Sequence, residues 1–188
     1  MGTEDTRAKL HAHVAACVVR HEKADIELAS GRMSDFYFDG RVATLTGESA
    51  ALLAELVLAE VDRLGATAVG GPTIGADPIV GATIALAASR GRNLKGFLIR
   101  KEPKKRGMGK QVEGPPLEGE RAVLVEDTVT SGGSIIRAAE ALRRECPGCE
   151  IAGAVTLVDR EEGGAAALEN AGLPLTAIFT RGDFPAAG

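Results

Sequence analysis

The sequence predicts an α/β protein in which a parallel sheet carries helices on both faces, with a small additional lobe at the N-terminus. From Ala66 onward, short apolar stretches alternate with helical segments, which is the pattern of strand–helix–strand units in a parallel sheet. Residues 1–45 lack this alternation. The length of 188 residues and the hydrophobic content of 45% fit one domain with a substantial core. We therefore expect a single domain, 1–188, in which about 1–45 form the lobe, here called the hood, and about 46–188 the core.

The first third of the chain is expected to contain two helices separated by a hairpin. Apolar residues recur every four positions from Leu10 to Val18, as on one face of a helix. The turn residues 30–32 precede three aromatic residues at 36–38, an arrangement typical of a hairpin. Leucine and valine then return at helical spacing. These patterns predict a helix over about 7–22, a hairpin within 26–39 and a helix over 48–64.

The core is expected to alternate between buried strands and helices. Short apolar runs bounded by turn residues are typical of strands buried on both faces, and longer alanine-rich or amphipathic stretches are typical of helices. The triplet 70–72, Gly-Gly-Pro, is expected to break the first strand. The predicted strands are 67–69, 96–99, 122–125, 151–158 and 175–179, and the predicted helices are 78–89, 135–145 and 164–170.

Nothing in the sequence indicates a membrane protein. No stretch approaches the ~20 uninterrupted apolar residues that a spanning helix needs. The first ten residues are polar and charged, and no apolar leader segment follows them. We therefore expect a cytoplasmic location and no membrane partner.

The three cysteines argue against a disulfide framework, because their number is odd and no secretory signal accompanies them. Cys146 and Cys149 have the C-x-x-C spacing of a redox pair or of half a zinc site. The other interpretation is a helix end followed by a turn that carries two thiols. This last interpretation is favoured, because redox pairs normally begin a helix and no second pair of zinc ligands is present.

Cationic charge is concentrated in residues 100–110. This segment holds six Lys and Arg residues against Glu102 alone, a local charge of +5, so the net charge of −4 leaves −9 on the rest of the chain. An acidic protein with one dense cationic segment suggests a small polyanionic ligand. Nucleic-acid binding more often needs a broad basic surface, so no nucleic-acid partner is expected. A solvated basic loop remains the other interpretation.

The segment most informative about chemistry is 123–134. Its buried strand ends in Glu126 and Asp127, and a loop of Thr, Ser and Gly leads directly into a helix. Ligands of open α/β sheets bind beyond the carboxyl ends of the strands, and free amides at a helix N-terminus stabilise an anion. Gly132 and Gly133 allow the backbone to approach that anion closely. Carboxylates repel phosphate but suit sugar hydroxyls or a metal bound to them. The segment therefore predicts a ribose 5-phosphate site.

Two common phosphate-binding patterns are excluded, because neither Gly-Lys-Ser/Thr nor G-x-G-x-x-G is present here. Instead, the four apolar positions, two acids and Thr/Ser/Gly loop resemble the signature of the type I phosphoribosyltransferases, which implies the fold of that family. The resemblance extends to the orotate phosphoribosyltransferases over roughly 28–160, in the right order. Segments 30–38, 71–78, 100–107 and 159–160 look like that family's base-side segment, pyrophosphate-side loop, catalytic loop and orotate-binding pair.

The resemblance implies a reaction and a set of sugar-binding residues. The family joins orotate to phosphoribosyl pyrophosphate (PRPP), giving orotidine 5′-monophosphate and pyrophosphate in pyrimidine (UMP) biosynthesis, with Mg²⁺. By position, Glu126 and Asp127 would bind the ribose hydroxyls and residues 130–134 the 5-phosphate. Magnesium would lie on the pyrophosphate and ribose hydroxyls near these acids, with no direct protein ligand assigned. The full set implied for PRPP is Arg100, Lys101, Lys104, Arg106, Glu126, Asp127, Thr128, Val129, Thr130, Ser131, Gly132, Gly133 and Ser134.

Catalysis is expected to depend on the cationic loop. Pyrophosphate leaves with growing negative charge, which preorganised cations and magnesium stabilise. Lys104 is the best single candidate, with Arg100, Arg106 and Asp127 as further catalytic residues. Closure of residues 100–114 would exclude water from the activated sugar. In the family, part of this loop reaches the neighbouring subunit, so the resemblance implies a homodimer with shared active sites.

The base site needs cationic or amide donors, because orotate is an anion. The resemblance implies Thr130 and Arg160, and Arg41 is a further cation. Tyr37 and Phe38 are candidates for stacking on the pyrimidine; on a strand they would point to opposite faces, so at most one would touch the base. The alternatives are a surface position for Arg160 and plain packing for the aromatics.

The sequence departs from the best-known form of the family at three positions, and two other functions stay open. Ala29 and Gly75 stand where lysine is frequent, and Arg106 stands where histidine is usual, which removes a proton donor but keeps a cation. The other functions are transfer to a purine base and a non-enzymatic PRPP sensor that binds nucleic acid. The segment 30–32 and the Asp159–Arg160 pair argue against the first, and the acidic balance outside one loop argues against the second.

Overall fold

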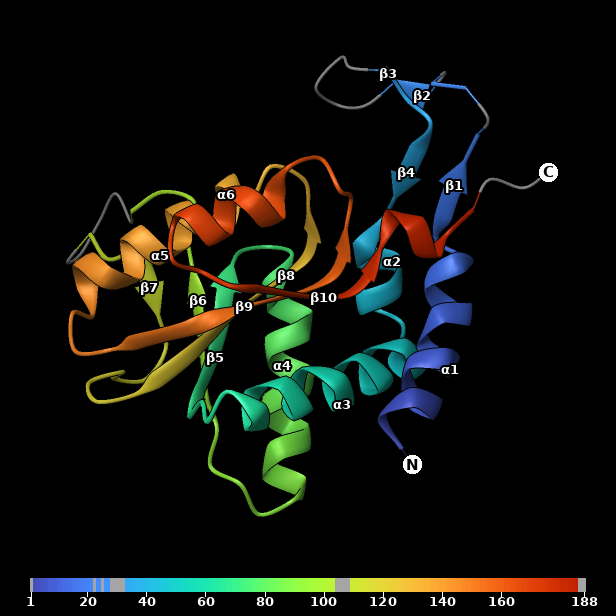
Figure 1. Ribbon diagram of the computed structural model, residues 1–188. Helices are drawn as coiled ribbons and strands as arrows, with labels where there is room; N and C mark the ends of the chain where they lie inside the picture. The colour runs from blue at the N-terminus through green and yellow to red at the C-terminus, as the bar shows by residue number, and fades with distance from the viewer. Residues whose placement is uncertain (1, 22, 25, 28–32, 104–108, 186–188) are drawn as a thin grey trace.

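The computed structural model describes residues 2–21, 23–24, 26–27, 33–103 and 109–185, and it has the predicted α/β architecture (Figure 1). Within these residues the main sheet has six strands in the order β10-β9-β8-β5-β6-β7. All neighbouring pairs are parallel except β6 and β7. The strands are β5 (Ala68–Pro72), β6 (Lys95–Ile99), β7 (Val112–Glu113), β8 (Arg121–Val129), β9 (Glu150–Asp159) and β10 (Leu175–Thr180).

Helices cover both faces of this sheet. In Figure 1, α5 (Gly133–Glu145) and α6 (Gly164–Asn170) lie above it, and α3 (Gly47–Arg63) and α4 (Ala76–Ser89) lie below it. Along β8, Val123 and Val125 pack with α3 and α4, whereas Ala122 and Leu124 pack with α5. Successive strand residues point to opposite faces, so a strand buried on both sides must be apolar throughout. This explains the unbroken apolar run at 122–125.

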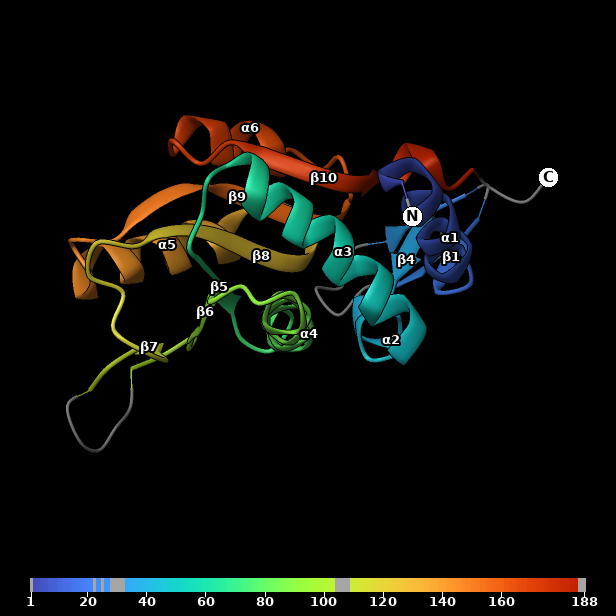
Figure 2. The same ribbon diagram turned by 90° about the horizontal axis from the view of Figure 1, so that it is seen from below.

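The hood consists of α1 (Thr3–Ala15), β1 (Val18–Arg20), β2 (Ile26–Glu27), β3 (Met33–Ser34), β4 (Phe36–Phe38) and α2 (Gly40–Thr44). The antiparallel β2–β3 pair confirms the predicted hairpin. Figures 1 and 2 both show the hood at one end of the molecule and β7 at the other. The described residues of the predicted base-side segment, 33–38, and the described part of the basic segment beside β7 therefore lie toward opposite ends of the molecule.

In the hood, one predicted helix end is wrong and one helix was missed. The helix expected to reach residue 22 ends at Ala15, because Val18–Arg20 pair with the aromatic strand β4 instead. That pairing accompanies the burial of Phe36 and Phe38, a long-range gain that local helical spacing does not reveal. The short helix α2 was not predicted; the Asp39 side chain caps it by accepting a hydrogen bond from the Arg41 amide at 3.2 Å.

Two predictions in the core are also corrected. The Gly-Gly-Pro triplet belongs to β5 rather than ending it. A Cβ on Gly71 would lie 2.1 Å from the Val125 carbonyl oxygen, so glycine serves close strand packing here rather than a turn. Strand β8 continues to Val129, four residues beyond the predicted end, so Glu126 and Asp127 lie on the strand itself. The two-residue strand β7 was not predicted.

The cysteine pair lies where the helix-end interpretation places it. Cys146 is the C-cap of α5, and the Cys149 amide donates to its carbonyl oxygen at 2.9 Å, forming a turn. Both cysteines are free. Burial raises the pKa of Cys149 to about 11, and nearby Cys146 and Glu120 add to the shift. Cys149 is therefore a thiol at neutral pH, which does not suit a redox pair.

None of the helices in the described part of the chain is long and apolar enough to cross a bilayer.

The close contact at Gly71 gives a stability prediction. We expect Gly71→Ala to lower the free energy of unfolding by roughly 2–3 kcal/mol or more, because the carbonyl oxygen that it meets belongs to a buried strand and cannot move away freely. Gly81→Ala, in α4, is the matched control: its Cβ would meet nothing within 4 Å, so a gain of up to about 1 kcal/mol is expected. Urea unfolding of both variants measures the difference, and equal effects would show that the contact does not matter.

Candidate active site

The predicted phosphate loop lies between the carboxyl end of β8 and the first turn of α5. Gly132 is the N-cap of α5 and adopts a left-handed conformation with φ of 76°. A Cβ there would lie 3.0 Å from the Gly164 carbonyl oxygen and from Leu168 in α6, so α6 holds the loop in place. No side chain of the described residues caps α5. Its first amides are therefore available to an anion.

The two acids of the motif are half-buried and resist ionisation. Burial raises the pKa of Glu126 to about 8, helped by the charge of Asp127 and opposed by a hydrogen bond from Ser134 and by the nearby Arg137. Burial also raises the pKa of Asp127, against a hydrogen bond from the Thr128 amide. Two adjacent, partly desolvated carboxyls favour a ligand that donates hydrogen bonds, as sugar hydroxyls do.

Asp127 is enclosed by two glycines from other parts of the chain. A Cβ on Gly40, the first residue of α2, would lie 2.6 Å from Asp127 Oδ2, and a Cβ on Gly75 would lie 2.7 Å from Oδ1. Asp127 thus lies where the hood, the loop before α4 and the end of β8 meet. A side chain at position 75 would require the Asp127 carboxylate to move, so Gly75 leaves room for that carboxylate.

Glu126 lines a cavity of about 190 Å³ on the side of α5. The cavity is also lined by Ser134 of the predicted phosphate loop, by Thr73 of the predicted pyrophosphate-side loop, and by Arg100 and Lys101 at the start of the basic segment. The structure therefore brings together the sugar, phosphate and pyrophosphate segments that the sequence separates. Its other lining residues are Pro72, Ile99, Gln111, Arg137 and Ala138.

Arg137 is a cation that sequence reasoning missed. It lies one turn into α5, lines the cavity with Glu126, and its Nη1 would lie 3.1 Å from a Cβ on Gly133. The absence of a side chain at Gly133 therefore leaves room for this guanidinium over the phosphate loop. Its spacing in the sequence could have indicated this position, because Arg137 follows Ser134 by three residues and residues three apart on a helix lie on the same face.

The two ends of the basic segment are fastened to each other and to α5. The Glu145 carboxylate accepts hydrogen bonds from the Gln111 amide at 3.0 and 3.1 Å and from the Val112 amide at 3.1 Å. The Gln111 side chain donates to the Arg100 carbonyl oxygen at 3.1 Å. Burial raises the pKa of Glu145, but these amide bonds and Arg144 outweigh it and leave that pKa lowered. The segment is thus fixed at its stem, a feature that no local sequence pattern indicated.

Several predicted residues are not described or have a limited role. Lys104 and Arg106, together with Ala29 and the turn 30–32, lie outside the described residues. Val129 is buried in the core, so only its backbone is available to a ligand. Thr128 and Thr130 are half-buried and Ser131 is exposed, at the end of β8 and in the loop.

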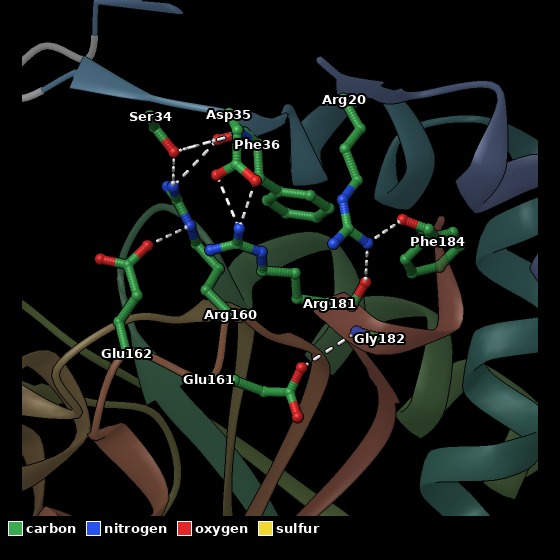
Figure 3. Close-up of polar contacts among 10 residues, drawn as sticks. All are labelled: Arg20, Ser34, Asp35, Phe36, Arg160, Glu161, Glu162, Arg181, Gly182 and Phe184. Atoms are coloured by element: carbon green, nitrogen blue, oxygen red, sulfur yellow. Dashed lines mark hydrogen bonds and ion pairs between the residues drawn. The ribbon is translucent and has the colours of Figure 1, made fainter. Parts of the chain in front are cut away.

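Arg160 is buried rather than on the surface, with only 9% of it exposed. Its Nη2 donates to Ser34 Oγ at 3.3 Å and to the Phe36 carbonyl oxygen at 3.0 Å, and its Nε lies 3.0 Å from Glu162 Oε1 (Figure 3). A buried guanidinium held between the sheet edge and the hood suits an anion site, because its orientation is fixed in advance.

The aromatic residues of β4 divide as a strand predicts. Phe36 and Phe38 are buried, whereas Tyr37 is 41% exposed. Phe38 packs in the core, which leaves Tyr37 as the accessible stacking candidate of the predicted pair. Arg41 lies beside Asp39, with Nε 3.5 Å from Oδ1, and its charge acts on Asp127. Arg41 therefore lies close to Asp127, one of the two acids predicted to bind the ribose.

Comparison with known proteins decides the family. Residues 66–171 match the model of the phosphoribosyl transferase domain. The orotate phosphoribosyltransferase of Streptomyces avermitilis is 42% identical over 172 residues, which are 91% of this chain and 92% of that protein. The chain belongs to the orotate phosphoribosyltransferase family. The orotate phosphoribosyltransferase of Rhodopirellula baltica is also 42% identical to this chain, over 169 residues, which are 87% of this chain and 86% of that protein.

Solved structures agree with this membership. The Mycobacterium tuberculosis H37Rv orotate phosphoribosyltransferase in complex with Fe(III) dicitrate has a TM-score of 0.79 at 36% identity, over 95% of this chain and 98% of that one. The same enzyme in complex with PRPP has a TM-score of 0.77 at 33% identity, with the same coverage. Adenine phosphoribosyltransferase from Leishmania donovani, 11% identical with a TM-score of 0.65, shares the fold alone. The predicted family and fold class are both confirmed.

The raised pKa of Glu126 gives a pH-dependent stability prediction. Its pKa is about 8 in the folded protein against an ordinary 4.5, so the folded state binds a proton more tightly, and wild-type stability falls as pH rises from about 4.5 to about 8. Glu126→Gln has no such proton. We expect its free energy of unfolding, relative to wild type, to increase across that window by about 3 kcal/mol.

Urea unfolding at pH 5 and pH 8.5 measures this change. Glu169→Gln, which changes an exposed carboxylate on α6, is the control and should follow wild type at both pH values. A difference between Glu126→Gln and wild type that does not change with pH would contradict the burial argument.

Proposed function

We propose that this site transfers the ribose 5-phosphate group of PRPP to orotate, giving orotidine 5′-monophosphate and pyrophosphate. The chain's family membership supports the reaction, and the relatives' shared name favours orotate over a purine base. The observation that carries the proposal is the junction of β8 and α5. There, two half-buried carboxyls with raised pKa values lie near the end of the strand, close to uncapped helix amides. This is the donor and acceptor set that a ribose 5-phosphate requires.

The sugar phosphate would be held by one continuous segment. Residues 130–134 would bind the 5-phosphate through their amides and hydroxyls. Glu126 and Asp127 would accept hydrogen bonds from the ribose hydroxyls, which would offset the cost of burying them. The positive charges of Arg137 and Arg41, which lower the pKa of Glu126 and Asp127 respectively, would favour the ionised acids once the hydroxyls are in place.

The pyrophosphate would lie on the cavity side of the site. Arg100 and Lys101 line this cavity with Thr73. As the bond between the anomeric carbon and the pyrophosphate oxygen breaks, a ring nitrogen of orotate forms the new bond to that carbon and releases its proton to pyrophosphate or to solvent. The electron pair of the broken bond leaves on pyrophosphate, so cations around that group stabilise the transition state more than the ground state. Lys104 and Arg106 would complete this set.

The donor chemistry of the site fits magnesium bound through the substrate. Within the described residues, no group of three or more His, Cys, Asp and Glu side chains could hold a metal ion alone. Mg²⁺ typically keeps several waters and binds through a few carboxylate and substrate phosphate oxygens, so the pyrophosphate oxygens and the ribose hydroxyls would hold it close to Glu126 and Asp127. When bound, the ion supplies positive charge against the leaving pyrophosphate.

For the base, Arg160 would bind the carboxylate of orotate and Thr130 a ring polar group, with Tyr37 as the exposed aromatic. The fixed, buried guanidinium of Arg160 supports this assignment. Three further properties stay predictions. They are a homodimer in which the loop 100–114 of each subunit reaches the partner's site, a cytoplasmic location, and the absence of a nucleic-acid partner.

An absorbance assay for orotate consumption tests the proposed function directly. With PRPP and magnesium present, orotate should be consumed and pyrophosphate released in equal amounts. A panel with adenine, hypoxanthine and uracil in place of orotate should give little or no pyrophosphate. Preferred turnover of a purine base would overturn the choice of acceptor, and no turnover with any base would favour the non-enzymatic sensor.

Lys104 provides the sharpest test of the catalytic loop. We expect Lys104→Ala to lower kcat with orotate by about 10²-fold, roughly 3 kcal/mol of barrier, because a cation that stabilises the leaving pyrophosphate is lost. Lys9→Ala, at an exposed lysine of α1, should leave kcat unchanged. A kcat for Lys104→Ala within about threefold of wild type, under ~0.7 kcal/mol, would exclude this role.

A further inference from the structure

A cluster of polar contacts joins the hood to the carboxyl edge of the sheet. Residues 34–36 of the hood lie against the residues that follow β9 and β10, which are more than 120 positions away in the sequence (Figure 3). Two arginines make the contact: Arg160 from the end of β9 and Arg181 from the 3₁₀ turn η1 (Arg181–Asp183) after β10. The proposed function uses Arg160 but gives Arg181 no role.

Arg181 forms an ion pair with Asp35. Its Nη2 lies 2.6 Å from Asp35 Oδ1 and is also bonded to Oδ2. The two side chains are only 28% and 25% exposed, so water screens this pair less than a surface pair. Removing one partner leaves a mostly buried charge without compensation.

Asp35 stands between the two acceptors that hold Arg160. The Ser34 hydroxyl and the Phe36 carbonyl oxygen both accept from Arg160 Nη2. The two guanidinium groups also share the buried ring of Phe36, at 5.6 Å from its centroid for Arg160 and 5.9 Å for Arg181. A shift of Asp35 would therefore move every contact that Arg160 makes with the hood.

The backbone of the 3₁₀ turn is fixed independently of the Arg181 side chain. Arg20 Nη1 donates to the Arg181 carbonyl oxygen at 3.1 Å and also bonds to the Phe184 carbonyl oxygen. The Gly182 amide donates to Glu161 Oε2 at 3.0 Å. Arg181 thus projects from a rigid base, and a substitution there should change the ion pair without releasing the turn.

The charges of the cluster are balanced in pairs. Arg160 forms an ion pair with Glu162, and Arg181 forms an ion pair with Asp35. If Arg181 loses its charge, Asp35 becomes an uncompensated carboxylate one residue from each acceptor of Arg160. It would then compete with an incoming anion for that guanidinium. Arg181 therefore has two effects. Its ion pair holds residues 34–36 in place, and it keeps the Asp35 carboxylate from pairing with the Arg160 guanidinium.

We propose that Arg181 is a positioning residue for the base site: through Asp35 it fixes residues 34–36 and keeps Arg160 available to an anionic base. This inference rests on the proposed role of Arg160 in binding orotate. Arg181 itself does not touch the substrate. Its effect should appear in the affinity for the anionic base and not in the affinity for PRPP.

Steady-state kinetics of Arg181→Met test this split. We expect the KM for orotate to rise about tenfold, with the KM for PRPP and kcat within twofold of wild type. The double variant Asp35→Asn, Arg181→Met should recover much of the loss, because the competing carboxylate is gone. Should Arg181→Met not fold at assay temperature, Arg181→Lys keeps a charge without the fork of donors and should raise the KM for orotate by a smaller factor.

Arg7→Met is the matched control. Arg7 also links the hood to η1, through Asp183 at 3.2 Å, but on a more exposed surface and without contact to residues 34–36. It should leave both KM values unchanged. Equal rises in both KM values for Arg181→Met, or no rise in either, would overturn the proposal, because a general structural role would act on both substrates.

Arg160→Lys separates this inference from the function on which it rests. A raised KM for orotate in Arg160→Lys with an unchanged KM in Arg181→Met would reject the positioning role alone. An unchanged KM for orotate in Arg160→Lys would reject the base-binding role of Arg160 and the inference together.

Discussion

The site depends on one electrostatic arrangement: two half-buried carboxyls near the end of β8, joined by the short loop that ends at Gly132 to the uncapped amides that open α5. Burial raises the pKa of both Glu126 and Asp127, and the first turn of α5 has free donors. A ligand with hydroxyls at one end and a phosphate at the other satisfies both. The rest of the fold holds this junction in place, through the buried strands on each side, the α6 contact at Gly132 and the glycines around Asp127.

Cations lie around the carboxyl end of the sheet on three separate elements. Arg137 comes from α5 itself, Arg100 and Lys101 from the segment that Glu145 fastens to α5, and Arg160 from the end of β9. In the proposed complex, the phosphate, the pyrophosphate and the base would therefore each contact cations with a different structural support. The hood contributes through residues 34–36 and through Gly40, which places the lobe against both the base side and the sugar side.

Much of this could be read from the sequence, because the deciding signals are local. Apolar runs bounded by turn residues located the strands, and the acid pair with its glycine loop predicted a sugar-phosphate site at the junction that the structure forms between β8 and α5. The predictions that were wrong concern segments whose structure depends on contacts with residues distant in the chain. The helix predicted to reach residue 22 gives way to pairing between β1 and β4, and Gly71 lies in a strand because Val125 packs against it. Arg181 and Glu145 carry no local pattern, since their roles come from contacts with residues 146 and 33 positions away.

Calorimetric titration of ribose 5-phosphate and of pyrophosphate into wild type and Asp127→Asn tests the central claim most directly. The variant keeps the size of the side chain and loses its charge. If the acids of β8 bind the sugar and the cavity cations bind pyrophosphate, ribose 5-phosphate should bind about tenfold more weakly to the variant, roughly 1.4 kcal/mol, while pyrophosphate binds equally well or better. Unchanged binding of ribose 5-phosphate together with weaker binding of pyrophosphate would contradict this account of the junction.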